Sequence, residues 1–246
     1  MCRFYAFVLT AVFSVFLTVA GFAADVPVLI DRSQAVAAGA GVSTKAFPDA
    51  DVVLVHDYEK AWYKPDGTGY TVEEVYEKIL TEKGKRESCT LDLYFHKHYN
   101  KVEVLQLELI KPDGRTVPID ISANSKSMVD ASQMGSNIYD PNSQTLNVTI
   151  PDLQIGDMVH VITKNTIIRT RIEDTWSEYF VLQSTNPILC YDIEISAPPE
   201  RPLACKMIKD EVKNTITFSQ KEVDGRIIYH WTARDVARIF EEPQLA

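Results

Sequence analysis

Cysteine is the residue type of this chain best suited to covalent chemistry, and Cys89, Cys190 and Cys205 lie beyond its first apolar run. A cysteine nucleophile needs a histidine within hydrogen-bonding reach and a third group that orients the histidine. Cys89 is followed by His96 and His98, but it has neither a helix N-terminus nor a cluster of basic residues nearby to lower its pKa. We therefore predict no catalytic residue in this chain and keep a Cys89-dependent enzyme as the enzymatic alternative.

The same cysteines allow two structural interpretations. In an oxidising compartment one disulfide can form, and Cys190 with Cys205 is the only pair close enough in sequence to suggest itself. In the other interpretation, which we favour, all three cysteines are small buried hydrophobic residues.

Histidines and carboxylates supply the other groups that could bind a metal or transfer a proton. His96 and His98 would lie on one face of a strand at a spacing that can bind a metal, but no third ligand is visible nearby. Acidic pairs such as Glu73–Glu74 fit solvated faces and turns better than a pair of catalytic carboxyls. The remaining histidines have no visible partner: His56, His160 and His230. The sequence thus predicts no metal site and no cofactor.

Aromatic residues gather at two places in the chain. The candidates for a ligand-binding platform are Trp62, Tyr63, Trp176 and Tyr179. A carbohydrate platform needs such rings exposed on one face, whereas a domain of this size needs large side chains in its core. We favour core packing for these rings and leave their ligand undefined.

The N-terminus has the pattern of a cleavable signal peptide. Arg3 supplies the positive charge, residues 4–20 form an apolar run, and Gly21 and Ala23 then place small residues at the two positions that a signal peptidase reads. We predict cleavage after Ala23 and export, so that the protein is periplasmic, envelope-associated or secreted, with no membrane span after cleavage. Cys2 precedes the apolar run, whereas a lipid anchor needs a cysteine after it.

The charge of the chain argues against two classes of partner. Its formal net charge is −9, from 25 basic and 34 acidic residues, and no long run of like charges is present. Polyanions such as nucleic acid and anionic lipid surfaces are attracted by basic patches, which this sequence lacks. We therefore expect neither as a partner.

Beyond residue 50 the sequence alternates between short apolar runs and turns. Such a pattern is typical of an all-β domain, here a β-sandwich of two mainly antiparallel sheets with roughly ten strands. Residues 24–48 are expected to be a flexible lead, and residues 122–141 a mobile loop. The expected strands lie at 51–63, 70–80, 90–95, 102–110, 115–119, 146–150, 158–163, 179–183, 191–196, 203–208, 215–219 and 227–231.

Three blocks of this sequence resemble one known family. They are the "KPDG" turn at 111–114, "IPDLQIGD" at 150–157, and the stretch 231–243 that ends in "EEP". In this order they resemble the bacterial domain of unknown function that precedes a transglutaminase-like core in exported proteins. The resemblance spans about residues 51–243. It implies a β-sandwich without catalytic residues, because the family's cysteine–histidine–aspartate triad lies in the core that follows the Glu-Pro exit.

These observations lead to an expected function and two alternatives. The chain is expected to comprise a signal peptide (1–23), the flexible lead (24–48), an accessory domain (49–243) and an exit (244–246) towards a transglutaminase-like domain absent from this sequence. That domain would be its partner, which the accessory domain positions or shields, alongside a cell-envelope protein or polymer. The alternatives are a stand-alone binding module for a cell-surface glycan or peptide, and the Cys89-dependent enzyme.

Overall fold

The structure is a computed structural model that describes residues 26–136, 139–206 and 215–240. The expected signal peptide and the exit at 244–246 lie outside these residues. In the described part no helix has both the length and the apolar content needed to cross a membrane. The elements in chain order are α1 (Arg32–Ala40), β1 (Val52–Tyr63), β2 (Gly69–Ile79), α2 (Glu82–Glu87), β3 (Thr90–His96), β4 (Asn100–Ile110), β5 (Thr116–Pro118), α3 (Ile121–Asn124), β6 (Ser125–Val129), the 3-10 helix η1 (Ala131–Ser136), β7 (Ser143–Thr149), β8 (Met158–Ile167), β9 (Ile188–Ala197), β10 (Ile216–Val223) and β11 (Arg226–Val236).

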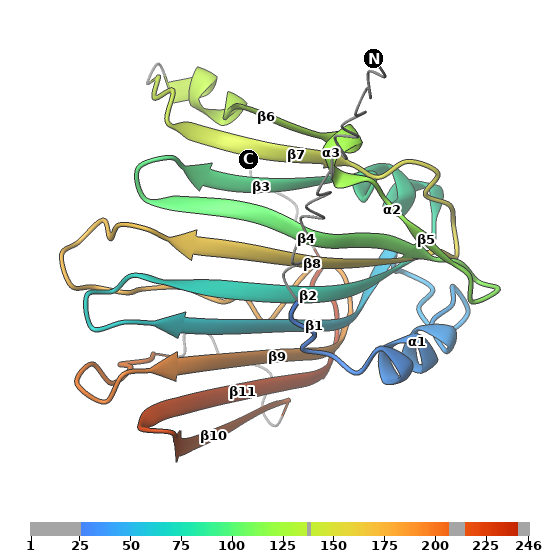
Figure 1. Cartoon of the computed structure of the whole chain (residues 1–246). Helices are drawn as coiled ribbons and strands as arrows, with labels where there is room; N and C mark the ends of the chain where they lie inside the picture. The colour runs from blue at the N-terminus through green and yellow to red at the C-terminus, as the bar shows by residue number, and fades with distance from the viewer. Residues whose placement is uncertain (1–25, 137–138, 207–214, 241–246) are drawn as a thin grey trace, which may run out of the picture.

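The strands form two sheets, which confirms the all-β prediction. The larger sheet has eight strands in the order β10-β11-β9-β1-β2-β8-β4-β5, and the smaller has three in the order β3-β7-β6. Neighbouring strands are antiparallel except for β1 and β9, which run parallel. Figure 1 shows the smaller sheet beyond the β4 side of the larger one, with the strands of both running in similar directions.

Alternation along each strand divides the larger sheet into two faces. On β2, Val75 and Ile79 point to one side, which we call face A, and Tyr76 points to the other, face B. A bulge in β1 between Leu54 and His56 shifts the register, so that His56 pairs with Tyr76 and lies on face B. The residue after it, on face A, is Asp57, which pairs with Val75.

Face A is covered by two different parts of the chain. Towards β4, Leu91 of β3 and Val148 of β7 pack against Ile79 and Leu107 of the larger sheet. Towards β11, irregular segments cover the sheet instead, and they bring Trp176, Phe180, Leu182 and Leu203 onto it. The two sheets thus pack face to face at one end only.

Part of face B is covered by the N-terminal segment, which we expected to be a flexible lead. Helix α1 begins where the Asp31 carboxylate accepts hydrogen bonds from the backbone N–H groups of Ser33 and Gln34. Ile30 and Ala35 are buried in one core cluster with residues of β1, β2 and β8. The segment has a low apolar content, so the sequence did not indicate that it packs against the sheet. A few small side chains are enough to hold it there.

The structure differs from the expected secondary structure in four other places. The turn expected at 82–85 is helix α2, and the loop expected at 122–141 contains α3, β6 and η1, because β6 pairs with β7. No strand forms at 179–183, where the side chains cover face A. The run expected at 203–208 is irregular over its described residues, 203–206.

Candidate functional site

Face B brings a cysteine, two histidines and an aspartate together across three strands. His56 comes from β1, Cys190 and Asp192 come from β9, and His230 comes from β11. The β1 bulge places His56 on this face, while the i, i+2 spacing of Cys190 and Asp192 places both of them on it. We call these four residues the Asp192 cluster.

The Asp192 carboxylate is the centre of this cluster. Its Oδ2 lies 2.9 Å from His56 Nε2 and accepts a hydrogen bond from Cys190 Sγ at 3.2 Å. Its Oδ1 lies 2.9 Å from His230 Nε2 and accepts from the Thr232 hydroxyl at 2.5 Å. All four partners therefore converge on one buried carboxylate.

The electrostatics of the cluster disfavour the ionised, reactive form of the thiol. Burial and the nearby Asp192 carboxylate raise the pKa of Cys190 to about 12. Burial opposes ionisation of Asp192, but hydrogen bonds from His56, Thr232 and Cys190 outweigh it and hold the pKa of Asp192 well below its usual range. A cysteine nucleophile needs the reverse shift, because the thiolate is the reactive form.

The same side chains are of the types that bind zinc. The ligand atoms of His56, Cys190 and Asp192 lie within 4.8 Å of one another. Both Asp192 oxygens already accept hydrogen bonds, so the cluster is complete as a hydrogen-bonded network without a metal. A second group with this geometry lies on face A and consists of Asp57, Glu59 and Glu73.

A further buried network on face B holds the N-terminal segment to the sheet. His160 of β8 lies between two carboxylates, with Nε2 2.9 Å from Glu74 Oε1 and Nδ1 2.7 Å from Glu108 Oε1. The other Glu74 oxygen accepts the backbone N–H groups of Leu29 at 2.6 Å and Ile30 at 2.9 Å. The Tyr76 ring stacks on His160, with 4.1 Å between the ring centroids.

Opposite charges stabilise each other in this network. Burial favours neutral His160, but hydrogen bonds to Glu108 and Glu74 outweigh burial and raise the pKa of His160. Burial likewise opposes ionisation of Glu74 and Glu108, yet the pKa of each carboxyl is lowered by its hydrogen bond to His160 and other donors. These pKa shifts favour the charged form of all three groups, and the network anchors the chain segment that enters α1.

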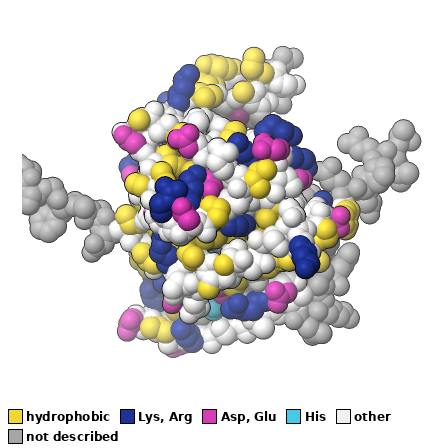
Figure 2. All heavy atoms as spheres, turned by 90° about the vertical axis from the view of Figure 1, so that its right-hand side faces the viewer, with side chains coloured by type: hydrophobic (Ala, Val, Ile, Leu, Met, Phe, Trp, Pro, Cys, Tyr) yellow, Lys and Arg dark blue, Asp and Glu magenta, His cyan; other side chains and the backbone are white. Residues whose placement is uncertain are grey.

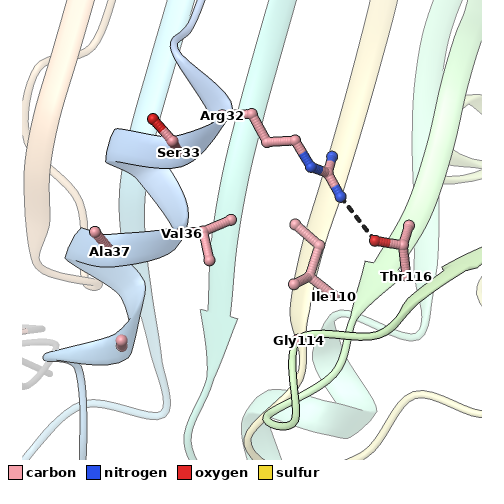
Figure 3. Close-up of a pocket in the computed structure, with 8 residues that line it drawn as sticks. Arg32, Ser33, Val36, Ala37, Ile110, Gly114 and Thr116 are labelled. Carbon is pink, nitrogen blue, oxygen red and sulfur yellow. Dashed lines mark hydrogen bonds between the residues drawn. The ribbon is translucent and has the colours of Figure 1, made fainter.

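A groove beside this network lies between α1 and the β4–β5 turn. Arg32 extends across it, pairs with Glu108, and donates to the Thr116 hydroxyl at 2.9 Å (Figure 3). The groove has a volume of about 570 Å³, and Val36, Ala37 and Ile110 contribute apolar surface to it. Figure 2 shows that this end of the molecule mixes basic and acidic side chains, so its described residues present no field of one sign.

The structure separates the three cysteines considered in the sequence. Cys89 is partly exposed, and its thiol donates to the Arg86 carbonyl at 3.1 Å. Cys190 is buried and Cys205 is exposed, and both are free thiols, so the proposed Cys190–Cys205 disulfide is not formed. Of the three, only Cys190 is buried as a small hydrophobic residue would be, because the chain leaves the sheet after β9 and carries Cys205 to the surface.

The aromatic candidates do not form one platform. Trp62 and Tyr63 are neighbours in β1 and lie on opposite faces. Tyr63 is buried on face A and stacks on Trp176, with 4.7 Å between centroids. Trp62 on face B stacks on Tyr70 at 5.7 Å and lies under the Arg226 guanidinium at 4.7 Å. Tyr179 stands apart from these rings with 82 % of its surface exposed.

Sequence reasoning missed most of the polar networks because their members are far apart in the chain. His56 and Asp192 are separated by 136 residues, and His160 and Glu74 by 86. Glu74 belongs to a pair that we assigned to a solvated face, but it is fully buried. The i, i+2 spacing of Cys190 and Asp192 was the one sequence feature that placed two members of a network on the same face. His96 bonds to Asp140 at 2.9 Å, a loop contact that alternation does not predict.

A solved structure of another protein has a fold similar to that of this chain. No curated protein matches the sequence. A crystal structure from Parabacteroides distasonis, described as "a putative protease", matches with a TM-score of 0.66 at 14 % identity, over 80 % of this chain and 38 % of the other. The chain therefore spans well under half of that protein.

Two further likenesses are too distant to establish a shared fold. The first is the CBM3a-L domain of a Clostridium thermocellum cellulosome scaffoldin, with a TM-score of 0.30 at 12 % identity, over 54 % of this chain and 81 % of that one. The second is an M1 zinc metallopeptidase from Deinococcus radiodurans, with a TM-score of 0.33 at 10 % identity, over 75 % of this chain and 39 % of that one.

The sequence also matches a family model. The match covers residues 65–240, which include the strands from β2 to β11 and the Asp192 cluster except for His56. The chain therefore belongs to DUF3857, a domain family of unknown function with solved structures.

Proposed function

We propose that this chain is a non-catalytic accessory domain of an exported bacterial protein, which precedes a transglutaminase-like core and positions or shields it. The observation that carries the non-catalytic part is the state of Cys190. In the described part of the chain it is the cysteine that lies beside both a histidine and an aspartate, and burial with Asp192 raises its pKa to about 12. Its thiol keeps its proton at neutral pH, and the neighbouring histidines are hydrogen-bonded to Asp192.

The accessory part of the proposal is supported by the length of a similar protein. The Parabacteroides distasonis structure contains this fold in 38 % of its chain, so most of that protein lies outside the shared fold. Its description as "a putative protease" fits a catalytic part elsewhere in the same chain. The sequence resemblance to domains that precede transglutaminase-like cores supports the same arrangement.

The surface where the described chain ends is suited to contact a following domain. Phe240 is 67 % exposed there and lines a groove of about 350 Å³ together with Phe47, Pro187 and Arg238. An exposed aromatic ring beside an apolar groove is typical of a surface that packs against a partner. This groove is therefore the contact surface that we propose for the core.

Binding between separately produced parts tests the proposal. The gene is first read beyond codon 246, where we expect a domain with a cysteine–histidine–aspartate triad. That domain is then titrated with this chain, with a Phe240→Asp variant, and with a matched Tyr94→Asp control whose ring is exposed on β3. We expect Phe240→Asp to weaken binding at least 10-fold and the control to leave it unchanged. A stop codon after Ala246, or equal binding by all three proteins, would contradict the proposal.

A further inference from the structure

Face A carries three carboxylates that the strand register forces together. Glu59 of β1 pairs directly with Glu73 of β2, and Asp57 lies two residues before Glu59 on the same face. Like charges directly opposite each other destabilise an antiparallel pair. Between the two hydrophobic clusters of face A, the strands therefore place three acidic side chains close together. Antiparallel sheets usually avoid this arrangement.

Among the residues that the structure describes, no group of opposite charge balances Asp57. The residue is only 7 % exposed, and its Oδ1 is buried without a hydrogen-bond partner among the described residues. Burial, followed by the nearby Glu73 and Glu59 carboxylates, raises the pKa of Asp57 well above its usual value. An unpaired buried carboxylate is among the most costly groups in a protein interior, so it calls for a proton or a cation.

The hydrogen-bond donors that the described residues offer to the other two carboxylates are neutral. The Tyr191 hydroxyl donates to Glu59, and the Thr163 hydroxyl donates to Glu73 at 3.2 Å. No lysine or arginine forms an ion pair with any of the three acids in the described part of the chain. Burial and Glu73 raise the pKa of Glu59 to about 7, a further consequence of uncompensated charge.

The spacing of the oxygens fits one class of ligand. One carboxylate oxygen from each residue lies within 4.8 Å of the other two. Three oxygens bound to one Ca²⁺ at 2.3–2.6 Å can all lie up to about 4.5 Å from one another, whereas three Mg²⁺ ligands at 2.0–2.1 Å reach only about 3.6 Å. Calcium therefore requires less movement of the strands than magnesium does.

We propose that Asp57, Glu59 and Glu73 bind a calcium ion on face A. The orphaned Asp57 oxygen supplies the buried ligand, and the half-buried Glu59 and Glu73 leave a path for the ion and for the waters that complete its coordination. The site lies between two hydrophobic clusters, beside Val75 of one and Tyr191 of the other. Calcium would hold β1 and β2 together where neither cluster covers them.

Calorimetric titration of the purified chain with CaCl2 tests the site. The protein is first treated with EDTA and dialysed at pH 8, and its thermal unfolding is also followed with and without CaCl2. The test variant is Asp57→Asn, which keeps the size of the side chain. The matched control is Glu77→Gln, since Glu77 lies on the same face of β2 but bonds to Ser88 at 2.5 Å outside the group.

We expect the wild type and the Glu77→Gln control to bind one Ca²⁺ and to unfold at a higher temperature when it is present. Asp57→Asn should bind Ca²⁺ at least 10-fold more weakly, and wild type should bind MgCl2 at least 10-fold more weakly than CaCl2. If Asp57→Asn does not fold, Glu59→Gln takes its place. Absence of Ca²⁺ binding by folded wild type would overturn the proposal and assign protons to the acids. Equal Ca²⁺ affinity in the wild type and Asp57→Asn would overturn it as well.

Discussion

Replacing Glu74 with glutamine tests how the N-terminal segment is held to face B. The carboxylate is fully buried and has four partners, which are the backbone N–H groups of Leu29 and Ile30, the Tyr76 hydroxyl and His160. Glutamine has nearly the same size but replaces one acceptor oxygen by an NH2 donor. Turned towards the backbone, that NH2 group faces the two N–H donors of Leu29 and Ile30; turned the other way, it faces His160 Nε2, which donates when the ring is protonated. Either way His160 loses one of its two negative partners.

The size of the effect follows from these contacts. A buried donor left without an acceptor costs about 1–3 kcal/mol, and breaking a buried ion pair costs about 3–5 kcal/mol. Because Glu108 still pairs with His160 in the variant, we expect a loss of about 3 kcal/mol in the free energy of unfolding. For a chain of this length that corresponds to a Tm lower by roughly 6–12 °C.

The loss should depend on pH in a defined way. His160 has a raised pKa when folded, so its contribution is complete below its ordinary value of 6.5 and is lost as the pH rises through the folded pKa. Glu74 and Glu108 have lowered pKa values, so their contributions are present above 4.5 and are lost as the pH falls through the folded pKa. The difference between wild type and Glu74→Gln is therefore largest between pH 4.5 and 6.5 and shrinks at alkaline pH.

Urea unfolding followed by tryptophan fluorescence measures the difference. The matched control is Glu87→Gln, because the Glu87 side chain is 60 % exposed on α2 and its substitution should change stability by less than about 0.5 kcal/mol. A loss below about 1 kcal/mol for Glu74→Gln at pH 5.5, or a loss that grows towards pH 9, would refute the reasoning.

Three further predictions follow from the same structure. Asp192→Asn should lower the free energy of unfolding by about 2–4 kcal/mol in urea titrations, since the amide cannot accept all four hydrogen bonds; a change near zero would contradict the role of Asp192. A thiol reagent at pH 8 should modify exposed Cys205 quickly and Cys190 only on unfolding, because roughly one Cys190 thiol in 10,000 is ionised at that pH. Mass spectrometry identifies the modified residue, and an early adduct on Cys190 would contradict this prediction. N-terminal sequencing of the exported protein should begin at Ala24, and an intact Met1 would exclude cleavage.

The sequence was sufficient to predict most of the strands because they alternate. Val102–Ile110 and Thr90–Phe95 show the period of two that defines a strand, and both lie within strands of the structure. Helix α1 was not predicted, since its small residues give no apolar stripe and only the Asp31 cap marks its start. Strand β6 was not predicted either, because its polar residues form a strand by pairing with β7.

The polar clusters were harder to predict because they depend on bulges and on strand order. The β1 bulge decides which face receives His56 and which receives Asp57, and nothing in the local sequence marks it. Parallel pairing of β1 with β9 then places His56 beside Asp192, although many strands separate them in the chain. Alternation alone showed that Cys190 and Asp192 share a face.

Peptide hydrolysis by the isolated chain, compared with hydrolysis by the longer gene product that we propose, tests the central claim of a non-catalytic accessory domain. Both proteins are assayed against the same peptide library, with Cys190→Ser variants of each. We predict no turnover by the isolated chain, and turnover by the longer product that the Cys190→Ser substitution leaves unchanged. Turnover by the isolated chain that Cys190→Ser abolishes would contradict the account.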